Sequence, residues 1–170
     1  MKYKFVFFCL LSSAFAKAQK NAAPTNEFSI TGEVKAPVLF SLKTATSFTS
    51  HSSDSVVIYN HLHERKRAIH KIKGILLKDV LEKAGLNEDK PKLFSLFYFT
   101  CIACDGYKVV FSWNEIFNTG IGDQLMIITE EDGKKADAID DHIAIISPLD
   151  KATGRRYLQN LQSIKVERVK

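Results

Sequence analysis

The sequence predicts a mixed α+β domain of mainly antiparallel strands with two or three short helices. Short segments alternate apolar and polar residues with a period of two, as half-buried strands do. Asp-Gly pairs at 105–106 and 132–133 are typical of the tight turns between antiparallel strands. The stretch 76–84 has its apolar residues at helical spacing. Many strands with few helices are characteristic of the α+β class.

The N-terminus predicts a secretory signal peptide over residues 1–18. Lys2 and Lys4 precede the apolar run 5–11, and the small-residue site 16–18 follows it. We expect cleavage before Gln19, and an exported protein that is periplasmic or secreted. Residues 19–26 are expected to form a flexible leader, and residues 27–170 a single domain.

Charge and hydropathy narrow the class of partner. Loss of Lys2, Lys4 and Lys17 with the signal peptide lowers the basic count from 24 to 21 against 19 acids, so the net charge falls from +5 to +2. No basic face or recognition motif for nucleic acid remains, and we expect no nucleic-acid partner. No later apolar run reaches the roughly 18 residues of a membrane helix, so no transmembrane segment is expected.

The strand and helix segments follow in order along the chain. The stretch 76–84 is predicted to be a helix ended by Gly85, and Ser112 with Glu115 forms a capping box that opens a second helix through Phe117. The basic stretch 61–74 predicts a hairpin or one long exposed strand, and the Ser-rich stretch 47–55 a turn. Strands are expected at 27–34, 38–41, 54–60, 93–100, 107–111, 124–129, 143–146 and 163–169.

Four segments in this order resemble the molybdopterin-binding domain of the sulfite oxidase superfamily, in its short, single-domain exported form. They are "FSITGEVKAPVLFSL" at 28–42, "GILLKDVLEKAGL" at 74–86, "DGYKVVFSWNEI" at 105–116 and "RRYLQNLQSIKVERV" at 155–169. The resemblance covers most of the chain. It implies the fold predicted above and makes molybdopterin a possible cofactor.

This sequence lacks the cysteine that binds the metal in active members of that family. Active members hold molybdenum with a cysteine thiolate shortly after a strand similar to 56–60, because soft sulfur ligands suit this metal. Residues 56–63 contain no cysteine. We therefore expect no cofactor and a non-catalytic binding or accessory protein, with a molybdopterin-dependent oxidoreductase of atypical metal site as one alternative.

Family geometry implies which residues would border the remaining cleft. Arg155 and Arg156 stand where the family often has a basic residue; they could attract a phosphate or be solvated loop charges. An aromatic and polar lining suits a small anionic ligand or the loop of a protein partner. The expected cleft residues are Tyr59, Asn60, His61, Tyr107 and Arg155.

Cys101 and Cys104 are the cysteines that remain after signal cleavage. Haem attachment requires a histidine directly after the second cysteine, but Asp105 stands there. A structural zinc site needs four ligands, commonly two cysteine pairs, and this sequence has only one such pair. An exported chain with an even number of cysteines favours a Cys101–Cys104 disulfide. Two buried, unoxidised thiols, or a redox or metal site, are the other possibilities.

Three histidines offer a second alternative function. His61 and His63 share one side of an extended strand, and His70 would lie near them if the stretch 61–74 folds back on itself. Three imidazoles from adjacent strands could hold Zn²⁺ or Cu²⁺. An exposed basic hairpin with solvated histidines explains the same pattern, as it does for the shorter cluster of Asp140, Asp141 and His142.

Overall fold

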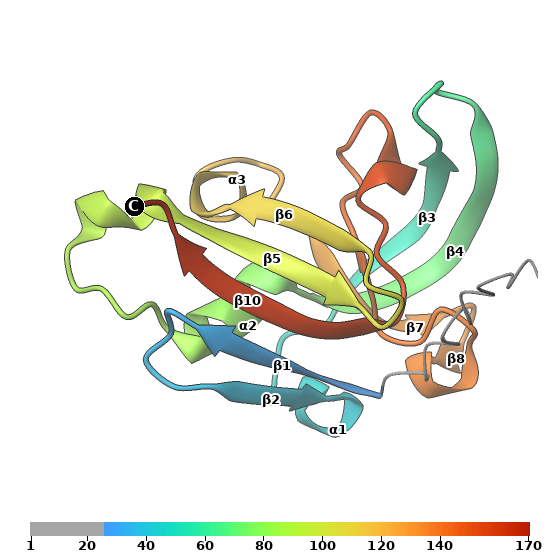
Figure 1. The fold of residues 1–170 in the computed structure, drawn as a ribbon. Coiled ribbons are helices and arrows are strands. Elements are labelled where there is room, and N and C mark those ends of the chain that lie inside the picture. The colour runs from blue at the N-terminus through green and yellow to red at the C-terminus, as the bar shows by residue number, and fades with distance from the viewer. Residues whose placement is uncertain (1–25) are drawn as a thin grey trace, which may run out of the picture.

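The computed structural model describes residues 26–170, which form two β-sheets with short helices beside them (Figure 1). The predicted signal peptide, 1–18, and residues 19–25 of the predicted leader lie outside the described residues. The predicted class, α+β with mainly antiparallel strands and a few short helices, is confirmed.

The first sheet has the strand order β2-β1-β10-β5-β6. Strand β10 joins the two halves of this sheet, because it pairs in parallel with β1 and antiparallel with β5. The other two pairings, β1 with β2 and β5 with β6, are antiparallel. The strands are β1 (Glu27–Gly32), β2 (Val38–Ser41), β5 (Phe97–Ala103), β6 (Lys108–Ser112) and β10 (Leu161–Arg168).

The second sheet is built on a long hairpin, β3–β4, and all its pairings are antiparallel. Strand β4 passes from the hairpin to β7, and β7 also pairs with β8 and β9. In Figure 1 this hairpin rises at the right of the molecule, away from the first sheet. The strands are β3 (His51–Tyr59), β4 (Arg65–Leu76), β7 (Met126–Glu131), β8 (Lys134–Lys135) and β9 (Ala144–Ile146).

The three α-helices are short, and the sequence supplies a start signal for α1 and α3 and a stop signal for α2. Helices α1 (Leu42–Ala45) and α3 (Trp113–Phe117) open on serine capping boxes, and α2 (Leu77–Ala84) ends at Gly85 in a positive-φ conformation. The 3₁₀ turns are η1 (Pro91–Leu96), η2 (Ala136–Ala138) and η3 (Thr153–Arg155).

Two apolar clusters hold the sheets together. The larger cluster packs one face of the first sheet, with Phe28, Phe99 and Phe111, against Leu77 and Val80 of α2. The smaller one lies within the second sheet and includes Val56, Ile69, Ile72, Met126 and Tyr157. The alternating burial of β5 supplies the inward residues of the larger cluster.

Two sequence predictions are wrong at element boundaries. Strand β3 begins at His51, so the second half of the predicted turn at 47–55 is strand; its pairing with β4 outweighs the turn preference of the serines. The predicted strand at 93–100 begins only at Phe97, because Pro91 starts a 3₁₀ turn through Leu96.

Candidate functional site

All five residues predicted to border a cleft line one solvent-connected hollow, hereafter the hairpin hollow. It has a volume of about 310 Å³ and lies where the end of the β3–β4 hairpin meets the β5–β6 turn and η3. Ile58, Lys66 and Gly154 complete its lining. The predicted residues in it are Tyr59, Asn60, His61, Tyr107 and Arg155.

A buried hydroxyl fixes η3 against β3. Thr153, 3% exposed, donates its Oγ1 hydrogen to the Val57 carbonyl at 2.7 Å and accepts from the Tyr59 amide at 2.8 Å. These bonds satisfy backbone groups at the point where the β3–β4 register shifts, between Ile58 and Tyr59. Thr153 therefore sets the distance between the hairpin and the loop that carries Arg155.

The approach of η3 is close enough to require glycine. A Cβ at position 154 would lie 2.8 Å from the Tyr59 carbonyl oxygen. Any larger side chain would push η3 away from β3 and widen the hairpin hollow. Gly154 is therefore needed for the observed shape of the hairpin hollow.

The β5–β6 turn brings Tyr107 to the same place. Gly106 has φ +87°, and the Asp105 carboxylate accepts a hydrogen bond from the Tyr107 amide at 2.8 Å. The Tyr107 hydroxyl, on a side chain that is 45% exposed, donates to the Arg155 carbonyl at 2.6 Å. Tyr107 therefore contributes its ring to the hollow, while its hydroxyl holds the Arg155 backbone.

Asn60 shapes the hairpin turn. Its Oδ1 accepts from the amides of Leu62 at 2.9 Å and Glu64 at 3.0 Å, and its Nδ2 donates to the Glu64 carboxylate at 2.8 Å. Hydrogen bonds from Lys66 and Asn60 lower the pKa of Glu64. With its amide used in this way, Asn60 has a positioning role.

The charges at the hairpin hollow are positive. Lys66 and Arg155 line it together with His61, and no carboxylate is among the lining residues. The Lys66 ammonium reaches Glu64 at 3.0 Å, an exposed ion pair that solvent screens. Arg155 donates no side-chain hydrogen bond to any of the residues 26–170, so its guanidinium can take an incoming anion.

The two neighbouring arginines have different environments. The Arg156 guanidinium binds Asp150 and, at 2.7 Å, Glu115, and it lies 4.6 Å from the centre of the Phe111 ring. The hydrogen bonds that Arg156 donates to the Asp150 and Glu115 carboxylates raise its pKa. Arg156 is thus a structural ion-pair residue, and Arg155 alone of the two lines the hollow.

The predicted histidine cluster is not assembled. His61 and His63 lie in the hairpin turn, whereas His70 pairs with Ser55 in the middle of β4. The chain turns at 60–64, so 65–74 is one extended strand that carries His70 away from the turn by about 3.3 Å per residue. Within residues 26–170, no three His, Cys, Asp or Glu side chains are arranged to hold a metal ion.

The predicted disulfide is also absent, for a local geometric reason. Cys101 is an inward residue of β5, and Cys104 directly follows the end of that strand. Residues three apart in an extended chain point to opposite faces, with Cα atoms about 10 Å apart, whereas a disulfide needs less than about 7 Å. Complete burial raises the pKa of the Cys101 thiol to about 12.

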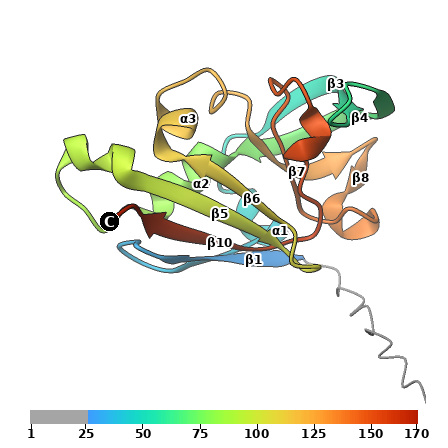
Figure 2. The same cartoon turned by 45° about the horizontal axis from the view of Figure 1, so that its top comes forward.

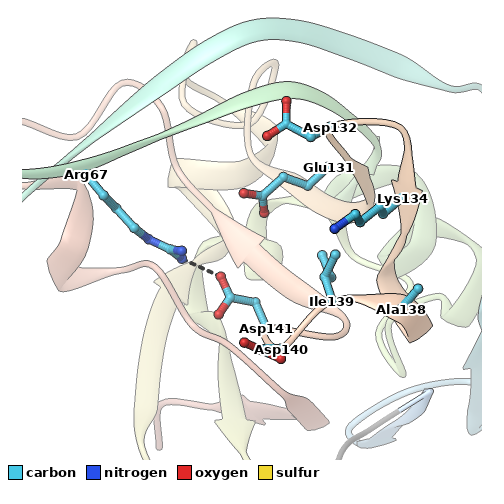
Figure 3. A pocket seen from close by; sticks show the side chains of 8 residues that line it. All are labelled: Arg67, Glu131, Asp132, Lys134, Ala138, Ile139, Asp140 and Asp141. Carbon is cyan, nitrogen blue, oxygen red and sulfur yellow. Dashed lines mark hydrogen bonds and ion pairs between the residues drawn. The ribbon is translucent and has the colours of Figure 1, made fainter.

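A second hollow, the acidic hollow, lies between the first residues of β4 and the segment 131–141, and it has a volume of about 310 Å³ (Figure 3). Asp141 points across it to Arg67, as the dashed line shows, and also accepts hydrogen bonds from Tyr157 and Gln159. Burial raises the pKa of Asp141, but these bonds outweigh it and the net shift is downward. The other lining residues are Glu131, Asp132, Lys134, Ala138, Ile139 and Asp140.

Of the sequence cluster Asp140–His142, only the two aspartates enter the acidic hollow. His142 turns away, and its Nδ1 lies 3.3 Å from the Asn26 side-chain oxygen. The Asp141 carboxylate already binds three side chains. The acidic hollow therefore serves to attach the 139–142 loop to β4.

Sequence reasoning missed three lining residues of the hairpin hollow, Ile58, Lys66 and Gly154, and it also missed Thr153, which positions η3 behind the lining. Lys66 carried a signal, because it belongs to the basic run beside the predicted cleft residues. Thr153 and Gly154 carried none, since their partners in β3 lie about 95 residues earlier in the chain. Only the tertiary fold brings these segments together.

A solved structure has a fold similar to that of this chain. The chain is similar to the crystal structure of the sulfane dehydrogenase SoxCD from Paracoccus pantotrophus, with a TM-score of 0.56 and 12% sequence identity. The similarity covers 82% of this chain and 37% of that chain, so this protein spans little more than a third of its neighbour. At this identity the comparison shows the fold, which is compatible with a sulfite oxidase-like domain.

Sequence comparisons add no family assignment. No family model matches the chain, and no curated protein matches it. Among residues 26–170, no helix is long and apolar enough to cross a membrane.

The hairpin hollow does not fit a metal held by a protein thiolate. Asn60 uses its side chain in the turn, and Cys101 is buried in the first sheet's core. Neither Cys101 nor Cys104 lines the hollow. The donors that remain are phenol, imidazole, ammonium and guanidinium groups, of which the last two attract anions and not metal cations.

Proposed function

We propose that this protein is an exported, non-catalytic binding or accessory protein whose hairpin hollow takes a small anionic ligand. One observation carries the proposal: Tyr59, His61, Tyr107 and Arg155, from three separate segments, line one hollow together with Lys66. Small ligands typically occupy clefts of about 300–1,000 Å³ with a few convergent polar groups. This hollow is at the lower end of that range.

The lining favours an anion over other ligands. Arg155 and Lys66 provide two cations and no carboxylate lines the hollow, although Lys66 is also paired with the exposed Glu64 at 3.0 Å. Arg155 can form two parallel hydrogen bonds to a phosphate, sulfate or carboxylate, and the phenol rings of Tyr59 and Tyr107 offer apolar contact to the rest of a ligand. An acidic loop of a protein partner would satisfy the same groups.

A molybdopterin-dependent oxidoreductase with an atypical metal site is the second candidate. The fold shared with a sulfane dehydrogenase favours it, whereas the donor set of the hollow does not. A His/Cys metal or redox function has less support, because His70 is remote from His61 and His63, and Cys101 is buried.

Isothermal titration with inorganic phosphate, sulfate and a pterin monophosphate tests anion binding. Replacing Arg155 by Gln should weaken binding roughly tenfold, since a charge-assisted hydrogen bond contributes about 1.5–3 kcal/mol. Lys66→Gln should act in the same direction. Arg65→Gln is the matched control, because Arg65 adjoins Lys66 but does not line the hollow. Binding that Arg155→Gln and Arg65→Gln weaken equally would contradict a direct contact.

Analysis of protein purified after native export separates the two candidates. A binding protein should contain no stoichiometric molybdenum, and its N-terminal residue should be Gln19 if residues 1–18 are a signal peptide. Near-stoichiometric molybdenum with a pterin fluorophore would favour the oxidoreductase. An intact N-terminus in the cytoplasm would contradict export.

A further inference from the structure

A group of aromatic side chains lies in a different place, between η1, α2 and α3. A hollow of about 430 Å³, the aromatic hollow, is lined there by Phe94, Phe99, Trp113, Phe117 and Leu81, with charged residues at its edge. Figure 2 shows η1 at the end of the first sheet opposite the tip of the β3–β4 hairpin, and the two hollows share no lining residue. The aromatic hollow is therefore distinct from the hairpin hollow.

The aromatic rings that line the aromatic hollow are in contact at different interplanar angles. Phe94 and Trp113 have ring centres 5.6 Å apart at 51°, and Trp113 and Phe117 have centres 5.4 Å apart at 24°. Phe99 and Leu81 are buried, whereas Phe94, Trp113 and Phe117 remain half-buried. Three adjacent half-buried aromatic side chains leave apolar surface that folding alone does not cover.

The edge of the aromatic hollow has an excess of negative charge. The Lys35 ammonium turns to Asp89 at 3.0 Å, so the lysine lines the hollow mainly by its carbon chain, which lies over Gly85. The backbone amides of Lys90 and Asp89, and then Arg168 at 2.9 Å, lower the pKa of Glu88.

Glu82 is the carboxylate at this edge that forms no ion pair: the nearby Lys78 feels its charge but is itself bound to Asp123 at 2.7 Å. Glu82 is exposed near the end of α2, and its carboxylate makes no hydrogen bond or ion pair with any residue in 26–170. Lys35 with Asp89, and Glu88 with Arg168, balance in pairs. One carboxylate thus stands beside a group of aromatic rings.

We propose that the aromatic hollow binds an organic cation, namely an alkylated or quaternary ammonium group with apolar substituents. Ring faces attract a cation through their quadrupole, and their apolar surface accommodates its alkyl groups. Glu82 supplies the opposite charge. This site selects a cation, whereas the hairpin hollow selects an anion, so the two proposals stand or fall separately.

The chain contains a built-in reporter for this site. Trp113 is its single tryptophan, so a change in tryptophan fluorescence reports on the aromatic hollow alone. The probes are choline and its uncharged isostere 3,3-dimethylbutan-1-ol, which differ by a quaternary nitrogen in place of a carbon. Titration calorimetry on the same samples measures affinity.

Choline should change Trp113 fluorescence and bind at least fivefold more tightly than the alcohol. Glu82→Gln should remove most of that preference and leave the weak binding of the alcohol unchanged. Asp54→Asn, which neutralises an exposed carboxylate on β3, is the matched control and should keep the preference. Phe117→Leu should weaken both probes.

Three outcomes would overturn the proposal. The first is equal affinity for the two probes, which would indicate an apolar site without charge selection. The second is an unchanged preference in a folded Glu82→Gln protein. The third is the absence of any fluorescence change at millimolar choline, with or without heat of binding, because binding elsewhere would leave Trp113 unaffected.

Discussion

At the scale of single residues, neighbours in sequence have opposite roles. Arg155 lines the hairpin hollow, and Arg156 is bound by Asp150 and Glu115. Cys101 faces the core, and Cys104 lies in the turn after the strand and is only partly buried. The residue type alone predicts neither difference, because each depends on which side of a strand or loop the side chain occupies.

The buried thiol leads to a prediction about reactivity. Because burial raises the pKa of Cys101 to about 12, its thiol stays protonated in the folded protein at pH 9, and iodoacetamide should modify it only after unfolding. Peptide mass spectrometry measures this, with Cys101→Ala to assign the signal. A Cys101–Cys104 peptide in unreduced protein would contradict the structure.

The raised pKa of Cys101 also predicts how the free energy of unfolding changes with pH. The unfolded thiol ionises near its ordinary pKa of about 8.5, well below that of the folded thiol. The favourable contribution of Cys101 is therefore complete below about pH 8.5 and is lost as the pH rises toward 12. Cys101→Ala should show a smaller decline in unfolding free energy across this interval.

At the scale of elements, start and stop signals in the sequence decide the boundaries. The Ser112 hydroxyl accepts from the Glu115 amide at 3.2 Å, and Glu115 accepts from the Ser112 amide at 2.8 Å. Pro91 starts η1 at the position where proline is tolerated best. These contacts join residues at most three apart, so they can be read before the fold is known.

Removing the cap of α3 should reduce stability by a measurable amount. Ser112→Ala leaves the Glu115 amide without its side-chain acceptor, which costs about 1 kcal/mol. For a domain of this size the melting temperature should fall by about 2–4 °C. Ser95→Ala, an exposed serine with only a 3.5 Å contact, is the control. Equal melting temperatures for the two variants would contradict a stabilising cap.

At the scale of the whole molecule, a few polar contacts connect the two sheets. Arg156 joins Glu115 of α3, which follows the first sheet, to Asp150 in the loop after β9 of the second. Tyr107 joins the β5–β6 turn to η3. The hairpin hollow exists because such contacts hold segments of both sheets in one arrangement.

The two consecutive arginines should therefore give opposite phenotypes. Arg156→Gln leaves two carboxylates, 11% and 34% exposed, without their partner, so unfolding free energy should fall by roughly 2–3 kcal/mol. Arg155→Gln should leave stability nearly unchanged and weaken anion binding. Urea unfolding combined with phosphate titration measures both. The interpretation fails if Arg155→Gln is the more destabilised protein.

The sequence by itself determined what depends on near neighbours along the chain. It predicted the α+β class, the Asp-Gly turns, a helix at 76–84, the capping box and most strands, since alternation, capping and turn preference act within a few residues. It also named five residues that share one hollow, through a resemblance in the order of segments.

The tertiary structure alone decided what depends on register and on distant partners. The turn at 60–64 separates His70 from His61 and His63, and the face of β5 separates Cys101 from Cys104. The contact of Thr153 with β3 spans 96 positions and assembles the hairpin hollow. Such contacts form only when the whole core is packed, because loop closure between remote segments is unfavourable until burial compensates for it.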